Sequence, residues 1–229
     1  MVIGISKKQD YSVVAADYIE QTIATLTISR EKVFIALSGG STPLPILEEL
    51  SKRAIAWDQL FFFMVDERIV PLDDSSSNFG AISKVFFNRI TSNSFSMVQK
   101  GMSTHEAIKA YESTMRDLME LNAEGFPVFD LILLGMGDDG HTASLFPGTS
   151  ALKENSKWVV ENKVPQLNTS RITLTYPTII SAKEIMVLVK GQTKKQIYRQ
   201  LISDTDTDYP MQRIVSDRKD VKWILEEHL

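Results

Sequence analysis

The amino-acid sequence predicts an α/β fold, in which helices cover both faces of a mostly parallel β-sheet. Short, nearly continuous apolar segments recur along the 229 residues, and segments of helical length separate them. Such apolar runs are typical of strands buried on both faces. Strands that alternate with helices favour parallel pairing, because each helix carries the chain back along the sheet. The length suits one core of this class, so we expect residues 1–229 to form a single α/β domain.

Four apolar runs are predicted to be the central strands: KVFIAL at 32–37, LFFFMV at 60–65, FDLILL at 129–134 and EIMVLVK at 184–190. RITLTY at 171–176 alternates between apolar and polar residues, which predicts a half-exposed strand that ends at Pro177 and leads into a short helix through Ile180. The apolar run at 221–225 is expected to return to the sheet.

The predicted helices span 10–27, 43–53, 78–87 and 104–122. Two of them begin at clear signals. Pro43 stands where a first-turn proline belongs, and residues 103–106 (STHE) have the pattern of a capping box. The segment SDTDTDY at 203–209 is predicted to be a loop.

The composition excludes several classes of function. The formal net charge is −4, so no general positive field attracts nucleic acid or an anionic membrane. Cys is absent, which excludes disulfides, thiolate nucleophiles and thiolate-bound zinc. No apolar stretch approaches the ~18 residues of a membrane span, and the first residues lack a secretory signal pattern. We expect a cytoplasmic protein without nucleic-acid or membrane partners; the oligomeric state stays unknown.

The three His residues do not suggest a metal site. His105 falls in the first turn of a predicted helix and His228 falls next to the last residue, so both are expected in solvent. His141 has no second His or Glu at a ligand spacing nearby. Metal-independent chemistry is therefore the expectation.

Ligands of open parallel sheets bind beyond the carboxyl ends of the strands, and the loops that follow the apolar runs are chemically unusual. The first loop contains Gly39, Gly40, Ser41 and Thr42 and opens the helix at Pro43. Its glycines permit close backbone approach, and the helix N-terminus with the two hydroxyls is suited to phosphate. The alternative is a tight strand-to-helix turn without a ligand, which also favours these residue types.

The second loop begins with Asp66, Glu67 and Arg68 directly after a strand. A carboxylate there is suited to transferring or orienting a proton, and the guanidinium group of Arg68 is suited to binding phosphate. The sequence equally allows a solvated charged loop, in which Asp66 acts as a capping residue and Arg68 pairs with Glu67 or Asp66.

The third loop, GMGDDGHTAS at 135–144, is the strongest functional signal. Gly137 and its neighbouring glycines bring backbone close to a ligand, and His141 is the side chain best suited to proton transfer near neutrality. Asp138 or Asp139 can orient the imidazole. The alternative is a structural His that bonds loop carbonyls.

Three more basic residues are candidates for an anion pocket. Arg171 opens the fifth predicted strand, and Lys190 and Lys194 flank the turn after the fourth apolar run. Ordinary surface charge explains the two lysines equally well, and it is the expectation for Lys195.

Together these loops resemble a known family. ALSGGSTP, VDERIVP followed by Ser77 and Asn78, LLGMGDDGHTASLFPG, RITLT and KGQTKK look like the 6-phosphogluconolactonases, and the ordered set spans residues 34–195. The resemblance implies a Rossmann-like α/β lactonase domain, no cofactor, and hydrolysis of a small sugar phosphate lactone, 6-phospho-D-glucono-1,5-lactone.

The resemblance also implies roles for particular residues. It makes His141 the general base, places Asp66, Arg68 and Asn78 in the active site, and adds Arg171 with the turn from Lys190 to Lys194 to the substrate pocket. The chain departs from the family pattern at residues 209–213 (YPMQR), where a Pro-Ala-Ser-like stretch is usual.

Two alternatives stay open. GGSTP and DERxVP are shared in looser form with glucosamine-6-phosphate deaminases, but those enzymes resemble DEYVGL after the second strand and have a Glu shortly beyond the Gly-His motif. This chain has Arg68, Pro71 and LFPG at 145–148 instead. The second alternative, a sugar-phosphate sensor that binds without turnover, is disfavoured by an intact His141.

Overall fold

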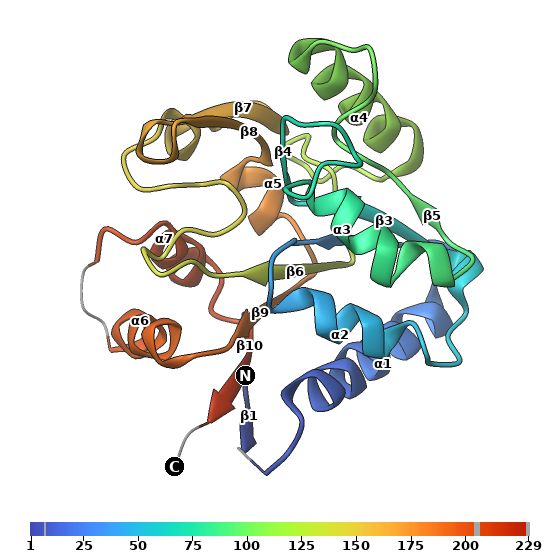
Figure 1. Ribbon diagram of the computed structural model, residues 1–229, viewed down its shortest axis with the longest axis vertical. Helices are drawn as coiled ribbons and strands as arrows, with labels where there is room; N and C mark the ends of the chain where they lie inside the picture. The colour runs from blue at the N-terminus through green and yellow to red at the C-terminus, as the bar shows by residue number, and fades with distance from the viewer. Residues whose placement is uncertain (7, 204–206, 228–229) are drawn as a thin grey trace.

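The computed structural model describes residues 1–6, 8–203 and 207–227, and these form a seven-stranded sheet and a separate three-stranded sheet (Figure 1). The larger sheet has the strand order β1-β10-β9-β6-β2-β3-β5, and all its neighbouring strands run parallel. The predicted mostly parallel sheet is confirmed. Its strands are β1 (Val2–Ser6), β2 (Val33–Leu37), β3 (Leu60–Met64), β5 (Asn93–Ser94), β6 (Leu131–Gly135), β9 (Glu184–Val189) and β10 (Lys222–Glu227).

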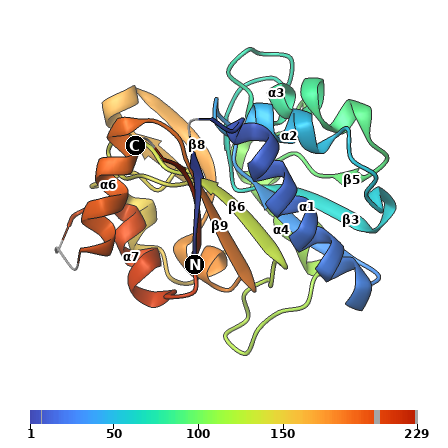
Figure 2. The ribbon, with the colours of Figure 1, turned by 90° about the horizontal axis from the view of Figure 1, so that it is seen from below.

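Helices cover the two faces of this sheet, as Figure 2 shows with α1 and α2 on one side and α6 and α7 on the other. The connections explain this division. The chain moves one way along the sheet from β2 to β3 and the opposite way from β9 to β10, so right-handed crossovers put the intervening helices on opposite faces. The α-helices are α1 (Tyr11–Ser29), α2 (Pro43–Leu50), α3 (Asn78–Val85), α4 (Thr104–Leu118), α5 (Tyr176–Ile180), α6 (Gln192–Ile202) and α7 (Pro210–Asp217).

Most predicted helices begin where the sequence signals place them. Asp10 is the N-cap of α1, Pro43 opens α2, and Ser103 and Glu106 form the predicted capping box of α4. The carboxyl ends agree less well, because α4 stops four residues before the predicted end at 122. Residues 204–206 of the predicted loop at 203–209, and His228, lie outside the described residues.

The smaller, antiparallel sheet is the main feature that sequence reasoning missed. It has the order β4-β8-β7, formed by β4 (Asp66–Arg68), β8 (Thr169–Leu174) and β7 (Val159–Val164). Of these only β8 was predicted. The expected half-exposed pattern at 171–176 was wrong, because residues 172–176 are buried and only Arg171 is partly exposed. The chain passes from one sheet to the other at Val65, whose N–H donates to the Leu37 carbonyl and whose carbonyl accepts from the Leu174 N–H.

Within the described ranges, no helix combines the length and apolar character that a membrane crossing requires.

The fully buried Tyr111 of α4 completes the backbone hydrogen bonds at the end of β3, where β5 has already ended. Its hydroxyl accepts a hydrogen bond from the Met64 N–H at 2.7 Å and donates to the Met64 carbonyl at 2.9 Å. The neighbouring strand β5 pairs only with Phe61 and Phe62, so it leaves Met64 without a strand partner on that side. The hydroxyl therefore serves both backbone groups of a strand residue that leads directly into Asp66.

We predict that Tyr111→Phe lowers the free energy of unfolding by about 1–3 kcal/mol, because the two buried groups of Met64 lose their partner. Tyr18→Phe is the matched control, since no hydrogen bond of the Tyr18 hydroxyl occurs within the described residues. Urea denaturation measures both variants. Equal effects of the two substitutions would show that the buried hydroxyl does not stabilise β3.

Candidate active site

The loops after β2, β3 and β6 meet residues of the smaller sheet around one cavity of about 220 Å³. The cavity lies beyond the carboxyl ends of the parallel strands, as expected for this class of sheet. The predicted site residues that line it are Gly39, Gly40, Ser41, Thr42, Asp66, Arg68, Asn78, Gly137, His141, Arg171 and Lys194.

The two remaining predicted residues lie elsewhere. Asp139 is bonded to His141 without lining the cavity itself. Lys190 is exposed, and its ammonium group lies over the Tyr11 ring at 5.6 Å from the ring centroid. The structure therefore does not bring Lys190 to the cavity. The expectation of surface charge at Lys195 was wrong, because Lys195 is buried on the inner face of α6.

The first loop is held close to its neighbours by glycine. A Cβ on Gly39 would overlap the Asn78 side chain, and the Asn78 amide donates to the Asp66 carbonyl at 3.0 Å. Gly40 has φ +99°, which favours glycine. Asn78 thus packs against one loop and bonds the next.

The N-terminus of α2 offers fewer donors to an anion than the sequence analysis expected. Pro43 and Pro45 have no N–H, and the Leu44 N–H donates to the Gly40 carbonyl at 3.4 Å. The hydroxyls of Ser41 and Thr42 stay available, because the Thr42 side chain forms no helix cap. The sequence already contained the signal for this, because Pro43 and Pro45 cannot donate backbone hydrogen bonds to an anion.

The two carboxylates after β3 have different surroundings. Glu67 is fully buried and accepts from the N–H groups of Arg68, Asn78 and Phe79, each at 2.7 Å, and from a hydroxyl. Burial raises the Glu67 pKa, and these backbone hydrogen bonds oppose the shift. Asp66 faces the cavity, and its Oδ2 accepts from the Ser144 hydroxyl at 2.6 Å. Glu67 is a structural residue that caps α3, a role that the sequence left open for Asp66.

Arg68 and Arg171 are directly opposite each other in the β4–β8 pair, and both line the cavity. Arg68 donates to the Ser76 carbonyl, and within the described ranges neither guanidinium forms a salt bridge. The Nε atoms of both are buried and have no hydrogen-bond partner there. Burial, followed by the charge of Arg68, lowers the pKa of Arg171. Two adjacent cations that line one cavity, and that form no salt bridge within the described ranges, favour a bound anion.

His141 is fixed from two sides. Its Nδ1 is hydrogen-bonded to the Asp139 carboxylate, and its ring stacks on Phe146 with centroids 4.0 Å apart and planes 25° apart. Since a carboxylate accepts, Nδ1 donates, and in the neutral imidazole Nε2 then carries the lone pair. Within the described residues Nε2 has no hydrogen-bond partner. Of the two acidic candidates, Asp139 therefore orients the imidazole.

The C-terminal segment that departs from the family pattern supports the His141 loop. The Tyr209 ring packs against Gly140, where a Cβ would overlap it, and the Met211 N–H donates to the Gly140 carbonyl at 3.1 Å. Met211 is fully buried in α7. Its side chain belongs to the core and not to the cavity.

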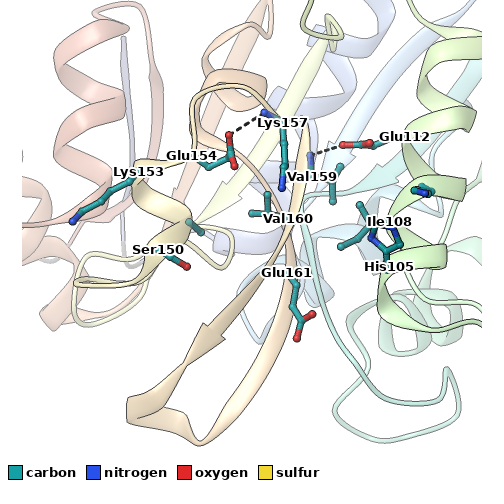
Figure 3. A pocket seen from close by; sticks show the side chains of 12 residues that line it. His105, Ile108, Glu112, Ser150, Lys153, Glu154, Lys157, Val159, Val160 and Glu161 are labelled. Carbon is teal, nitrogen blue, oxygen red and sulfur yellow. Dashed lines mark hydrogen bonds between the residues drawn. The ribbon is translucent and has the colours of Figure 1, made fainter.

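A second cavity, of about 600 Å³, lies between α4, residues 150–154 and β7 and is lined by His105 (Figure 3). Two of its carboxylates are engaged locally: Glu112 accepts from the Val159 N–H at 3.1 Å, and Glu154 from the Lys157 N–H at 3.1 Å. In the close view Lys153 and Glu161 point in different directions. The smaller cavity is the candidate active site, because there the charged groups converge.

A search of the described residues finds no group of three or more His, Asp or Glu side chains placed to hold a metal ion. Metal independence and the absence of a cofactor stay predictions.

Comparisons with known proteins agree with the geometry. The family model of glucosamine-6-phosphate isomerases and 6-phosphogluconolactonase matches residues 6–223. The chain is 36% identical over 204 residues to the 6-phosphogluconolactonase of Chlamydia pneumoniae, covering 86% of this chain and 76% of that protein. The 6-phosphogluconolactonase of Thermotoga maritima is 33% identical over 199 residues, which cover 82% and 85% of the two chains.

Solved structures of 6-phosphogluconolactonases have the same fold as this chain. The 6-phosphogluconolactonase of Trypanosoma brucei superposes with a TM-score of 0.87 at 29% identity, covering 99% of this chain and 95% of that one. That of Thermotoga maritima gives 0.85 at 27% identity, with coverage of 99% and 100%. A monomeric glucosamine-6-phosphate deaminase gives 0.79 at 21% identity, with coverage of 99% and 97%, which shows a shared fold.

We predict that Gly137→Ala displaces the imidazole of His141, because a Cβ at position 137 would overlap the ring and the Asp139 carboxylate. Gly135→Ala is the control, since Gly135 lines the same cavity and a Cβ there meets no atom within 4 Å. The imidazole nitrogen signals in NMR spectra of both folded variants measure the change. Unchanged His141 signals in Gly137→Ala would disprove the close approach.

Proposed function

The chain belongs to the glucosamine-6-phosphate isomerase and 6-phosphogluconolactonase family, and on this premise we propose that it hydrolyses 6-phospho-D-glucono-1,5-lactone with His141 as the general base. The product is 6-phosphogluconate, and the reaction belongs to the oxidative pentose phosphate pathway. One observation carries the proposal: a single cavity contains an imidazole whose Nε2 has no hydrogen-bond partner, and two guanidinium groups that form no salt bridge, among the residues that the structure describes.

The basic groups supply the phosphate site. Arg68 and Arg171 present neighbouring guanidinium groups, and Lys194 at the start of α6 adds an ammonium group at the same cavity. Guanidinium groups bind phosphate through paired, charge-assisted hydrogen bonds. The phosphate of the substrate would thus fix the sugar with its lactone carbonyl toward the loop of His141.

Hydrolysis then needs one base. His141 Nε2 takes a proton from water while the water oxygen bonds to C1 of the lactone, and the carbonyl oxygen becomes an oxyanion. The oxyanion collapses, the bond from C1 to the ring oxygen breaks, and the imidazolium returns its proton to that oxygen. Asp139 holds the ring through Nδ1 and stabilises the imidazolium. Backbone N–H groups of the glycine loops are suited to the oxyanion.

Asp66 has a supporting part in this proposal. One of its oxygens is engaged by Ser144 and the residue lines the cavity, so it orients water or a sugar hydroxyl. Asn78 and Gly39 pack closely against each other where they line the same cavity.

We further propose that residues 1–229 act as one lactonase domain, because both sheets contribute residues to the cavity. A small-molecule sugar phosphate lactone is the proposed partner, without nucleic acid or membrane. We propose a cytoplasmic location, because the chain contains no Cys and therefore no disulfides. Two relatives from rice are named as chloroplastic enzymes.

A parallel assay with 6-phosphogluconolactone and glucosamine 6-phosphate tests the reaction class. We expect turnover of the lactone alone, because the flanks at Arg68, Pro71 and 145–148 depart from the deaminase pattern. Turnover of glucosamine 6-phosphate alone would replace the proposal by a deaminase, and tight binding without turnover of either would indicate a sensor.

We predict that His141→Asn lowers kcat by about 10²- to 10⁴-fold, the usual contribution of a positioned general base. His105→Ala serves as the control and is expected to keep the parent rate, because His105 lines the other cavity. Steady-state assays corrected for spontaneous hydrolysis measure both. A His141→Asn enzyme with parental kcat would refute the assignment of the base.

We predict that Arg68→Ala and Arg171→Ala each lower kcat/KM for the phosphorylated lactone by about 10- to 100-fold, through loss of charge-assisted hydrogen bonds to phosphate. Unphosphorylated gluconolactone is expected to be affected far less. Arg89→Ala is the control, since Arg89 forms an ion pair with Glu48 at 2.9 Å and does not line the cavity. Equal losses on both substrates would indicate a structural role for the arginines.

A further inference from the structure

We propose that Phe146 is a positioning residue for His141, and that its ring face fixes the imidazole plane in which Nε2 meets the attacking water. The proposal rests on the proposed function, because it assigns His141 the proton transfer. The two rings are 4.0 Å apart between centroids and 25° apart between planes, which is a stacked arrangement. Phe146 is only 4% exposed.

Asp139 alone would hold the imidazole weakly. Its side chain is 46% exposed, so solvent competes for the hydrogen bond to Nδ1. A single hydrogen bond that solvent can replace also opposes rotation about the Cβ–Cγ bond of His141 only weakly. A flat aromatic face at stacking distance removes this rotation, and Gly137 leaves space along another part of the ring.

Phe146 is in turn fixed by the smaller sheet. Its carbonyl accepts from the Thr149 hydroxyl at 2.8 Å, and that hydroxyl accepts from the Asn162 amide of β7 at 2.9 Å. The same Asn162 amide donates to the Ser144 carbonyl at 2.8 Å. Asn162 is fully buried, so the segment that carries Phe146 is attached at both ends to a rigid strand.

The stack also suits the charge that forms during the reaction. When His141 takes a proton from water it becomes an imidazolium, and the face of an aromatic ring attracts a cation. The aromatic face therefore favours the same ring position before and after proton transfer. An aliphatic side chain of similar size fills the space without a flat face.

Kinetics of Phe146→Leu and Phe146→Tyr test the inference. We expect Phe146→Leu to lower kcat by about 10- to 100-fold, because a misplaced base loses alignment with the water. KM for the phosphorylated lactone should stay within about twofold of the parent, since the phosphate contacts are unchanged. Phe146→Tyr keeps the flat face and is expected to restore most of kcat. Phe146→Met replaces the Leu variant if that variant does not fold.

Phe86→Leu is the matched control, because Phe86 is fully buried and does not line the cavity. It removes an aromatic ring from the core, so it is expected to lower stability and to keep kcat. An equal fall of kcat in Phe86→Leu and Phe146→Leu would overturn the proposal, and so would parental kcat in Phe146→Leu.

A second readout does not depend on turnover. The ring current of Phe146 shifts the carbon-bound proton signals of the His141 imidazole, and we expect these signals to move toward free-histidine values in Phe146→Leu and to stay shifted in Phe146→Tyr. Unmoved signals in Phe146→Leu would refute the stacking. If the parent did not hydrolyse the lactone, the proposed function would fail, while these NMR signals would still decide whether Phe146 positions the imidazole.

Discussion

The geometry of the cavity depends on one buried carboxylate. Glu67 receives hydrogen bonds from the backbone of β4 on one side and from the first turn of α3 on the other. Because side chains alternate along a strand, burying Glu67 inward turns Asp66 and Arg68 together toward the opposite side, where the cavity lies. The same interaction holds α3 in place, and with it Asn78. A buried acid that does not line the cavity thus places three residues that do.

The two sheets contribute different parts of the cavity. The parallel sheet supplies loops at its carboxyl edge, and glycines let those loops approach one another closely. The antiparallel sheet supplies the paired arginines through the register of Arg68 with Arg171, and it anchors the His141 loop through Asn162. The pairing of β8 with β7 therefore fixes the position of the arginine pair relative to His141, because Arg171 lies on β8 and Asn162 lies on β7.

The central strands could be predicted from the sequence because they are continuous apolar runs, a signal that depends on local composition alone. β4 could not, because the residues Asp66–Arg68 carry three charges and become a strand only by pairing with β8. The site loops were predictable from their place after strands. Which of two adjacent acids bonds His141 was not, because both Asp138 and Asp139 lie within reach along the chain. The exposure of Lys195 was also predicted wrongly. Its charge suggested a solvent-exposed side chain, but its position on α6 faces inward.

The pairing of β1 with β10 has a consequence for synthesis on the ribosome. β10 lies between β1 and β9 in the sheet, and the Met1 amino group bonds the Val221 carbonyl across 220 positions of the chain. β1 is therefore paired only after synthesis has passed β10, more than 200 residues further along the chain. Until then β1, with the apolar side chains of Ile3 and Ile5, presents an unsatisfied edge in a nascent chain, the kind of edge that recruits other strands.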